Sequence, residues 1–177
     1  MGQATTILGI ETSCDETAAA VVRRHGNGRT CIGVGKNIGG IPVHFGQDGA
    51  LYVAEGGYKQ GLSGVRKITA QGEVSTISGR VTEGHEDGSI DGALFRNPVG
   101  VATDALGHIY VADTGNYKIR KISPSGETIT LAGSSFGYED GEANEAKFST
   151  SLGQLWVDEN FNVYVADVNK VRMISQE

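Results

Sequence analysis

Residues 104–122 of this 177-residue chain read DALGHIYVADTGNYKIRKI. The run opens with an Asp-x-x-Gly turn, continues into an apolar strand at 109–113, and reaches a basic strand at 119–122 in which apolar and charged residues alternate. Such alternation is typical of half-buried antiparallel strands, and turn glycines supply positive φ angles. The stretch therefore predicts short antiparallel strands joined by tight turns.

The same pattern occurs three times along the chain. Copies of the apolar strand stand at 51–55, 109–113 and 163–167, and a basic strand follows each. An acidic, glycine-rich loop also occurs twice. Gly84, Asp87 and Phe95 of the first copy correspond to Gly137, Asp140 and Phe148 of the second, with the same spacing between each pair. Each unit reads as four strands, although the third stops before its fourth. A four-stranded unit cannot bury both faces alone, so units stack side by side, and radial stacking makes a propeller. We predict an all-β fold, a partial β-propeller of about three four-stranded blades preceded by a β-hairpin.

Residues 43–177 resemble NHL repeats, and the run at 104–122 carries the resemblance. The family implies a non-enzymatic binding or scaffold module, and in some members a basic face binds RNA. The basic strands here carry Arg66, Lys67, Lys118, Arg120, Lys121, Lys170 and Arg172. We interpret them as a solvated surface, because 21 Asp and Glu outnumber 15 Lys and Arg and the net charge of −6 argues against nucleic-acid binding.

Residues 7–22 read ILGIETSCDETAAAVV. This pattern predicts a β-hairpin with strands at 7–10 and 18–22. The stretch resembles the opening of the tRNA threonylcarbamoyladenosine transferases. The resemblance implies that Ser13 and Cys14 bind a cofactor and that Asp15 and Glu16 are catalytic. That family also needs a His-x-x-x-His metal pair, which the four histidines of this chain do not form. We therefore interpret 1–28 as an enzyme's first segment joined to a propeller fragment at 29–177, and expect a solvated turn at 13–17 with no bound cofactor. A fragment of a tRNA-modifying enzyme is the alternative.

Three carboxylates stand at the same place in successive units: Glu55, Asp113 and Asp167. They could line a metal site, as in lactonase-type propellers, which keeps a lactonase- or lyase-like enzyme as a further alternative. Recurrence in every unit favours a structural role, in which each carboxylate caps the turn that follows it. Asp87 and Asp140 are interpreted as turn-forming residues, with a Ca²⁺ contact as the alternative, and Trp156 as a packing residue. We expect no metal and no catalytic residue.

Two unpaired cysteines and the lack of a signal-like or membrane-spanning run predict an intracellular, cytoplasmic protein. Three blades leave apolar sheet faces uncovered at both ends, and such faces drive association. The expected partner is another protein or a second copy. Two copies would close a six-bladed ring head to tail, with residues 30–35 lending a partner chain its missing fourth strand.

Overall fold

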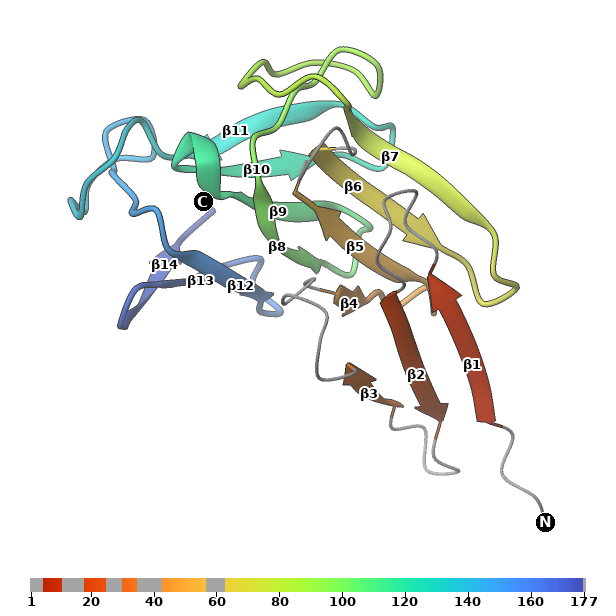
Figure 1. The fold of residues 1–177 in the computed structure, drawn as a ribbon. Coiled ribbons are helices and arrows are strands. Elements are labelled where there is room, and N and C mark those ends of the chain that lie inside the picture. The colour runs from red at the N-terminus through yellow and green to blue at the C-terminus, as the bar shows by residue number, and fades with distance from the viewer. Residues whose placement is uncertain (1–4, 11–17, 25–29, 35–42, 57–62, 177) are drawn as a thin grey trace. The chain divides into compact units, whose positions relative to one another are not determined.

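The computed structural model describes residues 5–10, 18–24, 30–34, 43–56 and 63–176. All regular elements in these ranges are β-strands, apart from one short 3-10 turn (Figure 1). The chain divides into two compact units, Met1–Gly40 and Ile41–Glu177, which we describe separately. Within the described ranges, no helix is long and apolar enough to cross a membrane.

The first unit is a three-stranded antiparallel sheet in the order β1-β2-β3. Its strands are β1 (Thr5–Ile10), β2 (Ala18–Arg24) and β3 (Thr30–Val34). Ile10 pairs with Ala18, which confirms the predicted hairpin. β3 pairs with β2, with Thr30 opposite Arg24, so a strand of its own unit occupies one of its edges. That residues 30–35 supply a strand to a partner chain stays a prediction.

The second unit is a partial β-propeller, as the repeat predicts. The first blade comprises β4 (Val43–Phe45), β5 (Leu51–Glu55), β6 (Ser63–Ile68) and β7 (Val74–Arg80). The second blade comprises β8 (Pro98–Thr103), β9 (Ile109–Asp113), β10 (Lys118–Ile122) and β11 (Thr128–Ala132), with the 3-10 turn η1 (Thr114–Asn116) between β9 and β10. The third has only β12 (Leu152–Val157), β13 (Val163–Asp167) and β14 (Lys170–Ile174). All three sheets are antiparallel meanders.

The second blade is covered on both faces. Successive side chains of β9 point to opposite sides, so Ile109 and Val111 join a core with the first blade, while Tyr110 and Ala112 join a core with the third. Every residue of β9 is consequently buried. Burying one Val, Leu or Ile side chain contributes roughly 1.5–3 kcal/mol. Stacking therefore supplies the apolar burial that a single blade lacks.

Candidate functional site

Arg120 is the central side chain of the second blade's polar network. Its side chain is 0% exposed. Nη1 donates to Asp113 Oδ2 at 2.8 Å and to the Leu94 carbonyl at 3.0 Å. Nη2 donates to the Glu86 carbonyl and to Asp87 Oδ1, both at 2.7 Å. The guanidinium also lies over the Phe95 ring, 4.9 Å from its centroid. Arg120 therefore ties the third strand of the blade to the acidic loop that precedes the blade.

Asp113 completes this network from the end of β9. Its Oδ1 accepts the Arg96 backbone N–H at 2.8 Å, and its Oδ2 accepts from the Asn116 side chain at 2.8 Å. The expected cap on the following turn is absent, because no Asp113 side-chain bond caps η1. Burial raises the pKa of the Asp113 carboxyl, while the bonds from Asn116 and Arg96 and the charge of Arg120 act in the opposite direction. The carboxylate thus joins an upstream loop to the arginine.

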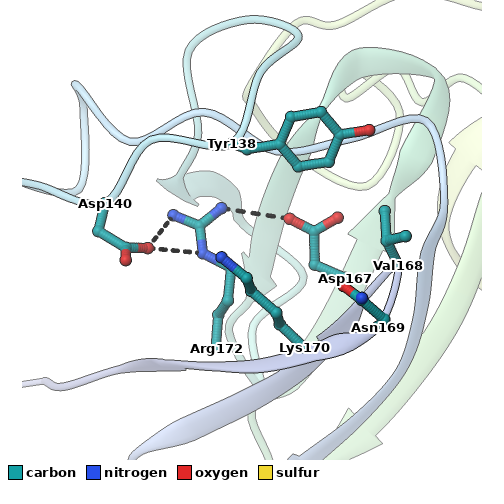
Figure 2. Close-up of a pocket in the computed structure, with 7 residues that line it drawn as sticks. All are labelled: Tyr138, Asp140, Asp167, Val168, Asn169, Lys170 and Arg172. Carbon is teal, nitrogen blue, oxygen red and sulfur yellow. Dashed lines mark hydrogen bonds and ion pairs between the residues drawn. The ribbon is translucent and has the colours of Figure 1, made fainter.

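The third blade repeats the network at its surface (Figure 2). Arg172 Nη1 donates to Asp167 Oδ2 at 3.2 Å, and Nη2 donates to the Glu139 carbonyl at 2.6 Å. Arg172 Nε donates to Asp140 Oδ1 at 2.9 Å. The guanidinium lies 4.4 Å from the Phe148 ring centroid. The same arrangement in two blades shows that the loop, the carboxylate and the arginine form one structural unit.

The first blade has a weaker version. Arg66 Nε donates to Glu55 Oε1 at 3.4 Å. Each of the three predicted carboxylates therefore pairs with the arginine of the basic strand that follows it. The expectation that these strands present solvated basic residues is wrong for Arg120 and Arg172. Because Arg66, Arg120 and Arg172 hold one position of the repeat, their recurrence was the signal in the sequence that could have identified the pairing.

A second set of carboxylates, absent from the sequence-based candidates, occupies the turns before the apolar strands. Asp104 Oδ1 accepts the backbone N–H groups of Leu106 and His108, each at 2.9 Å. Its Oδ2 accepts the Tyr110 hydroxyl at 3.0 Å. Burial raises the pKa of the Asp104 carboxyl, but the bonds from His108 and Tyr110 outweigh it and leave that pKa below its usual value. Asp48 with Tyr52 and Asp158 with Tyr164 repeat the tyrosine–carboxylate bond.

Tyr110 should titrate unusually late. Burial, together with its bond to Asp104, raises its pKa to about 12, while the bond from Gln176 acts in the opposite direction. An unfolded tyrosine titrates near 10, so the neutral phenol stabilises the fold fully below about pH 10. This contribution is lost as the pH rises through the folded pKa of about 12. In a pH titration followed by phenolate absorbance, we expect a step at the highest pH values. This step should shrink in Tyr110→Phe and persist in Tyr138→Phe. An unchanged step in Tyr110→Phe would contradict the assignment.

Three aromatic rings form a row beside the third blade's network. Phe136 makes edge-to-face contacts with Tyr117 and Tyr138, at centroid distances of 5.8 and 5.9 Å. Phe136 and Tyr138 are more than half exposed, and both lie on the loop that Arg172 holds. We call these three residues the aromatic row. Tyrosine and phenylalanine are enriched at protein–protein interfaces.

A small pocket of about 130 Å³ lies between this loop and the β13–β14 turn (Figure 2). The second blade places the Thr-Gly-Asn turn next to its carboxylate, where Asn116 contacts Asp113. The third unit has no Thr-Gly-Asn sequence at this place, and its β13–β14 turn, Val168 and Asn169, is two residues shorter. The pocket is lined by Tyr138, Asp140, Asp167, Val168, Asn169, Lys170 and Arg172.

The remaining predicted residues fall into two groups. Asp87 and Asp140 both bind the arginine of their own blade. Ser13, Cys14, Asp15 and Glu16 lie outside the residues that the structure describes. Across the described part of the chain, no group of three or more His, Cys, Asp or Glu side chains is arranged to hold a metal ion.

Comparison with known proteins supports the repeat assignment. Residues 95–122 match the NHL repeat. The chain is 38% identical over 88 residues to the chloroplastic protein SUPPRESSOR OF QUENCHING 1 of Arabidopsis thaliana, an overlap of 49% of this chain and 8% of that protein. It is 32% identical over 87 residues to human Teneurin-4, covering 42% of this chain and 3% of Teneurin-4. The chain thus spans a small part of these curated relatives.

A solved structure shares the fold. A structural genomics protein of unknown function from Bacteroides thetaiotaomicron VPI-5482 superposes with a TM-score of 0.67 at 23% identity. The superposition covers 88% of this chain and 44% of that protein, so the chain spans less than half of it. At this identity the likeness establishes the architecture alone. Together with the repeat match, it supports an NHL-repeat propeller.

Proposed function

We propose that the blades form a non-enzymatic binding module that recognises another protein through the aromatic row. The observation that carries this proposal is the exposure of Phe136 and Tyr138 on a loop held by a network of hydrogen bonds to Arg172. A preformed aromatic surface loses little conformational entropy on binding, which favours affinity. The NHL match supports the proposal, because such repeats commonly mediate protein interactions.

The charged residues of the blades support the same proposal. Arg120 and Asp113 are buried, and the bonds described above place them within the fold. A catalytic or metal-binding role would need such groups to face a substrate. A lactonase- or lyase-like enzyme would therefore require a different set of residues. The tRNA-modifying alternative depends on residues 7–28, and saturable Mg-ATP binding that Asp15→Ala abolishes would favour it.

Removing the aromatic row should abolish most partner binding. In a Phe136→Ala, Tyr138→Ala double variant we expect at least about a tenfold loss of retained partner, because aromatic anchors commonly contribute more than 1 kcal/mol each. The measurement is quantitative capture on the immobilised chain from an extract of the cells that make it. Ile129→Ala, at another exposed apolar residue, is the matched control and should bind normally. Equal capture by the double variant and the control would contradict the proposal.

Association with a second copy is one form that such binding could take. The head-to-tail ring predicted from the blade number requires an apolar face at each end of the array. The third blade exposes one such face, carrying Trp156, Val171 and Met173. We propose self-association through the blades on this basis.

A further inference from the structure

The polar networks of the second and third blades correspond contact by contact. Each contains a carboxylate, Asp113 or Asp167, that accepts a backbone N–H through Oδ1 and the arginine through Oδ2. Each arginine also donates to two loop carbonyls and to the loop aspartate, and these loop residues correspond at one constant spacing in the sequence. The second blade therefore shows which groups a complete network contains.

One donor of the second blade has no counterpart in the third. The Asn116 side chain donates to Asp113 Oδ2 at 2.8 Å and to the Gly84 carbonyl oxygen at 2.6 Å. Asp113 Oδ2 thus has two donors, Asn116 and Arg120. Among the described residues, Asp167 Oδ2 accepts from the arginine of its own blade alone. The third network is short of one amide group.

The pocket of the third blade lies where this amide would be (Figure 2). Asp167 is one of its lining residues, with a side chain that is 2% exposed. The Gly137 carbonyl is expected at the place of the Gly84 carbonyl, because both glycines donate the same backbone bond to the phenylalanine that ends their loop. The volume of about 130 Å³ is several times the roughly 30 Å³ that a water molecule occupies in the liquid. A group of a few heavy atoms fits there.

The charges around the pocket favour a neutral donor. Two carboxylates and two cations line it, so their formal charges balance: Asp140, Asp167, Lys170 and Arg172. All three guanidinium nitrogens of Arg172 already donate to protein oxygens, so an anion would find Lys170 alone. A ligand ammonium group would have the like charge of Lys170 beside it. A carboxamide brings two N–H donors and no net charge, which matches two acceptors in a neutral site.

Access to this position does not depend on what covers the third blade's outer face. The third blade covers the same face of the second blade, where Tyr110 and Ala112 are buried. Asn116 nevertheless stays only partly buried, because the β9–β10 turn lies beyond the ends of the strands. The equivalent position in the third blade can therefore be reached from solvent whether or not another blade packs beside it.

We propose that this pocket binds the side-chain carboxamide of an asparagine or glutamine of the partner protein. The inference rests on the proposed function, because the pocket and the aromatic row share Tyr138. The partner's amide N–H groups donate to Asp167 Oδ2 and to the Gly137 carbonyl, as those of Asn116 do in the second blade. A protein that packs on the aromatic row reaches the pocket with one side chain.

Acetamide, the side chain of asparagine without its backbone, is the probe that tests this site. In an NMR titration of the full chain we expect saturable shifts of the Tyr138 and Lys170 backbone signals. Acetone has the same shape without N–H donors, and acetate is charged, so each should bind at least tenfold more weakly. Ile129→Ala should bind acetamide as the natural chain does. No saturable shift with acetamide, or equal binding of acetamide and acetone, would overturn the proposal.

Two variants exchange the states of the two blades. Asn116→Ala opens the equivalent place in the second blade, so acetamide should bind this variant at two sites. Replacing residues 168–169 by the Thr-Gly-Asn-Tyr turn of residues 114–117 supplies the missing amide and should abolish the acetamide shifts at Tyr138. Circular dichroism checks that each variant is folded. A folded Asn116→Ala chain with one site, or shifts that survive the turn replacement, would contradict the proposal.

Partner capture separates this inference from the proposed function. Phe136 lies outside the pocket, so Phe136→Ala tests the aromatic row by itself. We expect the turn replacement to lower capture at least fivefold. Capture that Phe136→Ala lowers and the turn replacement leaves intact would refute the role of the pocket and support the row. Acetamide binding together with capture that Phe136→Ala leaves intact would refute the row and support the pocket.

Discussion

Replacing Arg120 by methionine should destabilise the protein by about 3–5 kcal/mol, as expected when one partner of a buried ion pair is removed. Methionine can occupy much of the same volume over the Phe95 ring. It leaves the Asp113 carboxylate without its cation and removes donors from the Leu94 and Glu86 carbonyls. Urea unfolding followed by tryptophan fluorescence or circular dichroism measures the loss.

The repeat offers two matched controls for this substitution. The arginine side chains of the second, third and first blades, Arg120, Arg172 and Arg66, are 0%, 11% and 30% exposed. Solvent screens exposed pairs, which contribute about 0–1 kcal/mol. We expect the loss of stability to fall in that order for methionine substitutions, with Arg66→Met near neutral. Equal small losses at all three positions would show that the buried network does not hold the second blade together.

Alanine in place of Gly100 should cost about 1–3 kcal/mol or more, the usual range for an overpacked core. Gly100 lies in β8, and a Cβ there would collide with the Gly153 carbonyl oxygen of the neighbouring β12. The obstacle is backbone, so the second and third blades would have to separate locally. The measurement is the same urea unfolding experiment, with the midpoint and the slope compared.

Gly153 provides the control for this close approach. A Cβ at Gly153 would meet the Ala166 Cβ at 3.4 Å, which is ordinary van der Waals contact. Gly153→Ala should therefore change the stability of the monomer little, although both glycines lie in the first strand of their blades. If Gly100→Ala and Gly153→Ala lower the free energy of unfolding equally, the second and third blades do not approach each other at Gly100 as closely as the structure shows.

Most of the fold could be predicted from the repeat. Each copy shows the alternation of apolar and polar residues along its strands and the order in which the strands follow one another. Copies of the apolar strand stand at 51–55, 109–113 and 163–167, and these three copies predict the three blades. Complete burial of β9 could not be predicted from alternation alone. The pattern of one strand resembles that of a half-buried sheet, and only the blades on both sides bury its second face.

The candidate site was predicted less well, for a physical reason. The recurrence of Asp113 and Asp167 marks them as candidates, but the sequence does not show which group each carboxylate contacts. Asp113 contacts Arg120 and the backbone N–H of Arg96. Asp167 contacts Arg172 and the backbone N–H of Ser149. Those contacts arise when a long loop folds back over the blade. The aromatic row depends on the same loop, so sequence spacing alone did not bring Phe136 and Tyr117 together.

Far-UV circular dichroism of the full chain tests the central claim, that this chain is an array of stacked β-blades, most directly. The account predicts a β-sheet spectrum with little helical signal, because the described residues contain strands and a single three-residue 3-10 turn. A spectrum with roughly a third of the residues in α-helix, the ordinary share in globular proteins, would contradict it.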